Sequence, residues 1–264
     1  MLQIQESNDE ELVLKLWVGQ SFVTALRHVI HGEVETMAIE DIVFEKNESQ
    51  ESNEFLSHHI SNIVLSCTNI DSFIYKKQCA CDNYCQHCSA LFHLNVQNEQ
   101  KSNVTIYSRH LKALNKTVYV THMDTPLFTL KPGARVDATL IARKGCGDIH
   151  AKWRPATVVG FRRDLKVQLH PSITAEQFQS VAKGCPTKVF EDIEDIQSSK
   201  CIYCQRCIKQ AQDMQLPDLV TIQDVPDYWI FNLESTGSML PSQIFLAALR
   251  IMENRLIKMS EVLT

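Results

Sequence analysis

Four cysteines within a ten-residue stretch could bind a metal ion. Cys79, Cys81, Cys85 and Cys88 follow the pattern C-x-C-x3-C-x2-C, and the residues between them are typical of a tight, solvated loop. Four thiolates this close in sequence can converge on a tetrahedral Zn²⁺ ion, with Zn–S bonds of about 2.3 Å. The metal would replace the core that such a loop lacks. The pattern therefore predicts a structural zinc site without an open catalytic position. The alternatives are two disulfides in a secreted module, or free thiols.

A second cysteine group lies further along the chain. Cys201, Cys204 and Cys207 form C-x2-C-x2-C, and Cys185 precedes Pro186 upstream of them. In ferredoxin-type proteins, a trio with this spacing is completed on its cluster by a distant Cys-Pro cysteine. Three interpretations stay open: a 4Fe–4S cluster, a second zinc ion, or cysteines without a metal. In either metal case we expect the ion or cluster to fold a loop-rich lobe.

The composition is that of an ordinary globular protein. The 264 residues suffice for one large or two modest domains, and 44% are hydrophobic and 22% charged. The net charge is −5 and no run of Lys or Arg stands out, so the sequence does not support direct nucleic-acid binding through a basic patch. We expect no signal peptide and no membrane helix. Ten cysteines in such a chain favour a reducing compartment and metal chemistry.

Hydrophobic periodicity predicts the elements that must position these cysteines. Helices are expected at residues 21–30, 54–63, 171–183 and 241–263. Strands are expected at residues 10–18, 37–44, 63–67, 90–96, 104–107, 117–121, 135–143, 157–169 and 228–233. Residues 185–224, which contain the second cysteine group, are expected to be loop-rich. The mixture predicts an α+β fold.

The last predicted helix carries an apolar seam. The apolar residues recur four and three residues apart, as in a heptad pattern, at Phe245, Leu249, Met252, Leu256, Met259 and Leu263. The seam predicts either an amphipathic helix that packs on its own sheet or a helix that also packs on a partner.

Five segments with distinctive motifs follow one another along nearly the whole chain. They are TALRH at 24–28 with EVETMAI at 33–39, EFLSHHI at 54–60, the first cysteine loop with Ser89, KGCGDIHAKWRP at 144–155, and FNLESTGS at 231–238. In content and order they resemble the alpha-like subunits of multisubunit RNA polymerases, especially the third-largest subunit of eukaryotic RNA polymerase II and its archaeal counterpart. Thr24, His28 and Glu35 stand where the family usually has Asn, Arg and Pro. The chain is therefore identified as a divergent member.

The resemblance implies a fold of two parts. A discontinuous dimerisation domain of sheet plus helices would comprise residues 1–46 and 156–264, with the cysteine-containing lobe at 185–224 within it. An inserted, mostly β domain at 47–155 would bind zinc. Some of the archaeal counterparts carry an iron–sulfur cluster in the region that resembles the second cysteine group.

The resemblance also implies a function. The protein would be a non-catalytic assembly subunit of a DNA-dependent RNA polymerase, paired with a smaller alpha-like subunit. That heterodimer would be the platform for the second-largest and largest subunits and for small zinc-containing subunits, and DNA would be reached only through the complex. We expect a nuclear location, or the cytoplasm or virion for a viral enzyme. The alternative is an iron–sulfur electron carrier or redox enzyme, which leaves the first cysteine loop unexplained.

Two groups of side chains are expected to contact partners. In the family, the first and last helices pack on the smaller subunit. The first helix would contribute Phe22, Leu26, Val29 and Ile30, and the last would contribute the seam. A small basic cluster around Trp153, formed by Lys144, His150, Lys152 and Arg154, is interpreted as a protein contact because four such side chains are too few for nucleic-acid binding.

Overall fold

The structure is a computed structural model that describes residues 2–193 and 195–263, without the side chain of Ser199. Helices and strands are mixed, which confirms the predicted α+β class. The chain divides into two compact units. Unit 1 contains the residues up to Ile4, Leu14–Val23 and Phe161–Phe231, and unit 2 contains Gln5–Val13, Thr24–Gly160 and the chain from Asn232 onward. Among the described residues, no helix is long and apolar enough to cross a membrane.

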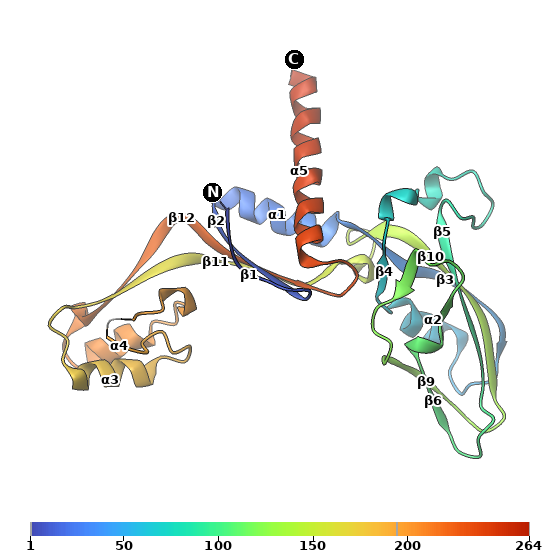
Figure 1. The fold of residues 1–264 in the computed structure, drawn as a ribbon, viewed down its shortest axis with the longest axis horizontal. Coiled ribbons are helices and arrows are strands. Elements are labelled where there is room, and N and C mark those ends of the chain that lie inside the picture. The colour runs from blue at the N-terminus through green and yellow to red at the C-terminus, as the bar shows by residue number, and fades with distance from the viewer. Residues whose placement is uncertain (1, 194, 264) are drawn as a thin grey trace. The chain divides into compact units, whose positions relative to one another are not determined.

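A four-stranded antiparallel sheet forms the centre of unit 2 (Figure 1). Its strand order is β3 (Glu35–Asn47), β10 (Arg135–Cys146), β5 (Ser89–Gln97) and β7 (Lys112–Ala113). Strand β10 pairs with β3 on one side and β5 on the other, so Leu140 lies opposite both Ile42 and Phe92. Half-buried and buried residues alternate along β10 from Arg135 to Leu140, because successive side chains of a strand point to opposite faces of the sheet, whereas the residues from Leu140 to Arg143 are all buried.

Helix α2 (Asn53–Ser61) contributes to the core of this unit. Its residues Leu56 and Ile60 belong to the same buried apolar cluster as Phe92 of β5. The Ser52 hydroxyl caps the helix by accepting a hydrogen bond from the Phe55 backbone N–H at 3.2 Å. Unit 2 also contains two short antiparallel pairs, β4 (Leu65–Cys67) with β8 (Val118–Val120) and β6 (Val104–Tyr107) with β9 (Pro126–Leu130).

The turn after β10 lies against the end of helix α1 (Gln20–Gly32). The Asp148 backbone N–H donates to the Gly32 carbonyl at 2.8 Å. The backbone approaches so closely that a Cβ atom on Gly147 would lie 1.8 Å from the His31 carbonyl oxygen. Only glycine, which has no Cβ, permits this approach. Gly147, the second glycine of the KGCGDIHAKWRP segment, therefore has a packing role.

A second four-stranded sheet has the order β1 (Leu2–Ser7), β2 (Glu11–Trp17), β12 (Val220–Ser235) and β11 (Ala156–Leu169). Each of its strands has residues in both units. Helix α5 (Pro241–Leu263) belongs to unit 2 and begins at a proline, which is well tolerated in a first helical turn.

Unit 1 also contains a small helical lobe with its own apolar core. Its helices are α3 (Ala175–Gly184) and α4 (Arg206–Asp213). Thr174 and Gln177 form a capping box at the start of α3, in which each side chain accepts from the other residue's backbone N–H. Val181 of α3 and Ala211 of α4 are fully buried in this core.

Sequence periodicity misses several elements. Helix α4 lies in the region that the sequence predicts to be loop-rich, and periodicity does not predict strands β1, β7 and β9. Strand β1 is exposed along its whole length, so no alternation of buried and exposed residues marks it. Helix α4 is short, with few apolar residues, and follows Gln205 in a left-handed backbone conformation.

Candidate metal centre

The first cysteine loop brings its four sulfur atoms together. Cys79 Sγ lies 3.5 Å from Cys81 Sγ and 3.5 Å from Cys85 Sγ, and Cys88 Sγ lies 3.5 Å and 3.7 Å from the same two atoms. All four cysteines are free thiols. Tetrahedral coordination with Zn–S bonds of about 2.3 Å separates neighbouring sulfur atoms by about 3.8 Å. The donor set and its spacing therefore fit a tetrahedral metal ion.

Local backbone hydrogen bonds shape the loop. The short 3-10 helix η2 (Lys76–Gln78) leads into Cys79, whose N–H donates to the Lys76 carbonyl at 3.1 Å. At the other end, the Cys85 carbonyl accepts from the Cys88 N–H at 3.2 Å and from the Ser89 hydroxyl at 2.8 Å. Ser89 is the first residue of β5, so this end of the loop is fixed to the central sheet of unit 2.

The loop shifts the pKa values of two of its thiols in opposite directions: hydrogen bonds with the neighbouring thiols raise the pKa of Cys79 to about 11, whereas the pKa of Cys85 is lowered. A hydrogen bond from the His87 backbone N–H is the main cause that lowers the pKa of Cys85 to about 6. Metal binding requires deprotonated cysteines, so a thiol that already ionises near neutral pH is a suitable ligand. Cys88 is fully buried while the other three cysteines are half-buried, and no fifth protein ligand is needed.

Arg143 joins the cysteine loop to strand β3. Its guanidinium donates to the Asn83 carbonyl at 3.1 Å, and Asn83 lies between the second and third cysteines of the loop. The same side chain forms ion pairs with Glu40 at 3.1 Å and Asp41 at 2.6 Å on β3. Arg143 itself lies on β10 and is buried, so three separate segments meet at one guanidinium.

A second polar cluster surrounds Tyr75, the residue before η2. Lys144 Nζ lies 2.6 Å from Glu35 Oε2 and 5.5 Å from the centre of the Tyr75 ring. Burial, followed by a hydrogen bond with Glu35, raises the pKa of Tyr75. The phenol therefore stays neutral, and the start of the loop is tied to both β3 and β10.

The second cysteine group lies in the lobe of unit 1. Cys185, Cys201, Cys204 and Cys207 all line one small cavity of about 10 Å³. Burial raises the pKa of the Cys207 thiol. In residues 2–193 and 195–263, the first cysteine loop is the one group of three or more potential metal ligands whose donor atoms lie within 4.8 Å of one another. The four cysteines of the second group line a common cavity, but their sulfur atoms do not all lie within 4.8 Å of one another. The binding of a metal or cluster by this group stays a prediction.

The predicted partner residues divide into buried and exposed side chains. On α1, Leu26, Val29 and Ile30 are buried within the chain, whereas Phe22 is 37% exposed. On α5, Phe245 is buried and Leu249 and Met252 are half-buried. Leu256 and Met259 are 67% and 64% exposed. The exposed part of the seam is thus the C-terminal half of α5.

The predicted basic cluster makes internal contacts. Trp153 is buried, and its indole Nε1–H donates to the Arg143 carbonyl at 3.0 Å. Lys152 Nζ donates to the Ile39 carbonyl at 2.8 Å and lies 4.4 Å from the centre of the Trp153 ring. Burial lowers the pKa of Lys152. His150 is exposed, and a partner role for this cluster stays a prediction.

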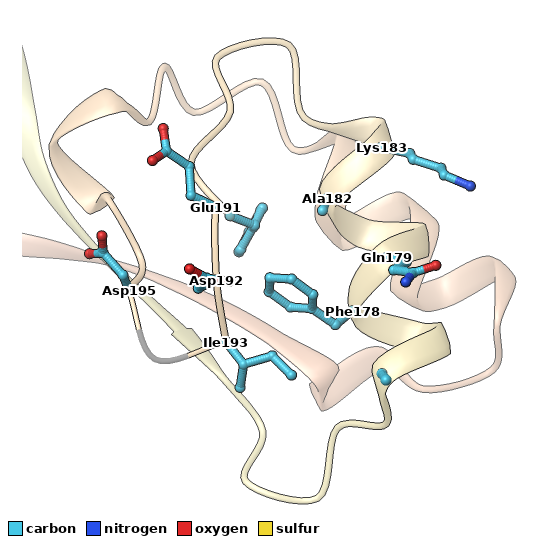
Figure 2. A pocket seen from close by; sticks show the side chains of 10 residues that line it. Phe178, Gln179, Ala182, Lys183, Glu191, Asp192, Ile193 and Asp195 are labelled. Carbon is cyan, nitrogen blue, oxygen red and sulfur yellow. The ribbon is translucent and has the colours of Figure 1, made fainter.

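A broad hollow of about 800 Å³ lies beside α3 in unit 1 (Figure 2). The Phe178 ring points into it from α3, and Ile193 and Asp192 approach it from the facing segment. Phe190 lines both this hollow and the cysteine cavity of the same lobe, but none of the cysteines lines the hollow. Among the described residues, no group of potential metal ligands gathers in it.

The amino-acid sequence matches a known family over residues 33–159, which contain the cysteine loop. The family is described as the RNA polymerase Rpb3/RpoA insert domain. DNA-directed RNA polymerase II subunit rpb3 from Dictyostelium discoideum is 31% identical over 279 residues, covering 97% of this chain and 92% of the relative. The chain belongs to the alpha-like family of RNA polymerase subunits. The resemblance deduced from the motifs is confirmed.

Other alpha-like subunits match over nearly their whole length. The archaeal DNA-directed RNA polymerase subunit Rpo3 from Methanosphaera stadtmanae is 26% identical over 260 residues, which is 96% of this chain and 95% of the relative. Subunit 3 of the DNA-directed RNA polymerases II, IV and V of Arabidopsis thaliana is 28% identical over 282 residues, covering 97% and 88%. The alpha-like relatives thus include eukaryotic and archaeal subunits.

Proposed function

We propose that this protein is a non-catalytic assembly subunit of a DNA-directed RNA polymerase. The observation that carries the proposal is the match to a polymerase II subunit over 97% of the chain. Nucleotide addition would take place in the largest subunits of the enzyme, and this chain would contact DNA only through the complex. The eukaryotic relatives support a nuclear location. The relatives described above are polymerase subunits, and none of them favours an iron–sulfur redox protein.

In this proposal the chain pairs with a smaller alpha-like subunit through α5. The C-terminal half of that helix exposes Leu256, Met259 and Val262, and also Ile257 and Leu263. An apolar surface of this kind on one helix is costly to leave in water and is typical of an interface. The resulting heterodimer would be the platform for the second-largest and largest subunits and for small zinc-containing subunits.

The cysteine loop would hold one Zn²⁺ in a structural role. Four thiolates would fill the tetrahedral shell and leave no position for a substrate or an activated water. When bound, the metal would cross-link the four cysteines of the loop. Hydrogen bonds of Arg143 and Ser89 attach that loop to the sheet of unit 2.

Charge introduced on α5 tests the pairing. Leu256→Asp combined with Met259→Asp would place two charges in the exposed seam, where burying them against a partner is strongly unfavourable. Both residues are exposed, so the chain itself should fold normally and keep its zinc. We expect the tagged double variant to lose the smaller subunit in a pull-down, together with the two largest subunits.

Lys258→Asp is the matched control, because Lys258 lies in the same helical turn, is exposed and is outside the seam. It should still assemble. A double variant that assembles as well as the wild-type chain would contradict the proposed pairing.

A further inference from the structure

Lys76 makes an unusual set of contacts with the cysteine loop. Its ammonium group lies 3.3 Å from Cys81 Sγ and 3.2 Å from the Asp82 carbonyl oxygen, and it also donates to the Cys81 carbonyl oxygen. An ammonium has three donors, and here each has an acceptor. Two of these contacts are to backbone carbonyls, as at many loop ends. The third is to a sulfur atom that belongs to the candidate metal shell.

The position of Lys76 is fixed by its neighbours. It is the first residue of η2, and the N–H of Cys79 returns to its carbonyl oxygen at 3.1 Å. The preceding Tyr75 is held by the ion pair of Lys144 with Glu35. The Lys76 side chain is half-buried, whereas that of the adjacent Lys77 is exposed. The ammonium is therefore directed at the loop by the local fold.

The charge of the candidate metal site explains why a cation would be useful there. Four thiolates and one divalent ion carry a net charge of −2, and a positive group hydrogen-bonded to a thiolate offsets part of that charge. Such outer contacts orient metal ligands, and their loss typically reduces metal affinity by about 10–100-fold. No described histidine or arginine takes this place in the loop; Arg143 bonds to Asn83 and not to a sulfur.

We propose that Lys76 is a positioning residue of the metal centre. Its ammonium holds Cys81 Sγ in place, withdraws electron density from that thiolate and offsets the charge of the metal–thiolate group. The inference rests on the proposed occupation of the cysteine loop by zinc.

The test compares three variants of the full-length chain with the wild type. Lys76→Met removes the charge and the donors but keeps the apolar stem, Lys76→Arg restores a cation with N–H donors, and Lys77→Met is the matched neighbour. Zinc content is measured by elemental analysis, and zinc release by transfer to a coloured chelator. We expect about tenfold faster release from Lys76→Met. Lys76→Arg should recover most of the wild-type rate, and Lys77→Met should equal the wild type.

Cobalt substitution separates a contact with sulfur from simple loop bracing. The thiolate-to-cobalt charge-transfer band should move to longer wavelength in Lys76→Met, because Cys81 then keeps more electron density. A variant that releases metal faster with an unchanged band would show that Lys76 only braces the backbone carbonyls, and would overturn the sulfur contact. A zinc-loaded Lys76→Met protein that releases zinc at the wild-type rate would overturn the role of Lys76 but leave the zinc proposal intact. Wild-type protein that holds no metal in the loop would overturn the metal proposal and this inference together.

Discussion

At the scale of single residues, the metal proposal depends on four cysteines that lie within one short stretch of the chain. Their spacing alone predicts convergence, and the structure places the four sulfur atoms within 4.8 Å of one another. The residues that support them are not predictable. The contact of Lys76 with the loop depends on the direction of its side chain, and no sequence motif encodes that direction. Arg143 lies 60 residues from its loop partner Asn83, so only the pairing of β10 with β3 and β5 brings it there.

Removal of one loop cysteine should release the metal. Cys85→Ser replaces a thiolate with a poor ligand for Zn²⁺, so the full-length variant should contain one zinc equivalent less than the wild type. Without the metal the loop loses its cross-link, and proteases should cleave within it. Elemental analysis and limited proteolysis measure the two effects.

Cys67→Ser is the control, because Cys67 is a free, half-buried thiol on β4 outside the loop. It should keep the wild-type zinc content. Full zinc content in the Cys85→Ser protein would contradict the proposed ligand set.

The colour and zinc content of the purified protein distinguish the interpretations of the second cysteine group. After anaerobic purification, a 4Fe–4S cluster would make the protein brown with visible absorption, whereas a second zinc would leave it colourless with two zinc equivalents. We predict that one of these occurs and that Cys204→Ser abolishes it, because all four cysteines surround one cavity. A colourless protein with a single zinc equivalent would refute both metal versions.

At the scale of elements, Arg143 makes the cysteine loop part of the central sheet of unit 2. Arg143→Met keeps much of the side-chain volume but removes the hydrogen bonds to Asn83, Glu40 and Asp41. Each hydrogen bond to a charged group contributes about 1.5–3 kcal/mol to stability. The total loss in the variant is smaller than the sum of these contributions, because water can hydrate the two carboxylates once the guanidinium is gone. We therefore expect unit 2 to be destabilised by about 2 kcal/mol.

Hydrogen exchange of backbone amides in β3, β10 and the cysteine loop measures this effect. Arg109→Met is the matched control, since Arg109 forms an exposed ion pair with Asp124. Exposed pairs contribute about 0.2–1 kcal/mol. Equal protection in the two variants would mean that Arg143 does not tie the loop to the sheet.

Helices α1 and α5 show what sequence periodicity cannot predict about apolar residues. The seam of α5 is visible from the spacing of its residues, but spacing cannot separate burial within the chain from burial against a partner. In the structure Phe245 is buried, whereas Leu256 and Met259 are exposed. On α1 the chain itself buries Leu26 and Ile30. The difference depends on which segments pack on each helix, which periodicity does not encode.

At the scale of the whole molecule, the order of the motifs carries more information than any single one. The chain is similar to a polymerase II subunit along 97% of its own length and 92% of the relative's length, so the likeness is not confined to one motif. The α+β class and the family are accessible from the sequence. The division into units at Gly160 and Phe231 is not, because it falls inside the continuous strands β11 and β12.

As an assembly subunit of an RNA polymerase, this chain should be recovered together with the rest of the enzyme. The most direct measurement is affinity purification of the tagged full-length protein at its native abundance, followed by quantitative mass spectrometry. We expect a smaller alpha-like subunit and the second-largest and largest polymerase subunits, each in about equal amount to the tagged chain. A zinc-loaded, folded chain that is recovered alone, or with proteins that are not polymerase subunits, would contradict it.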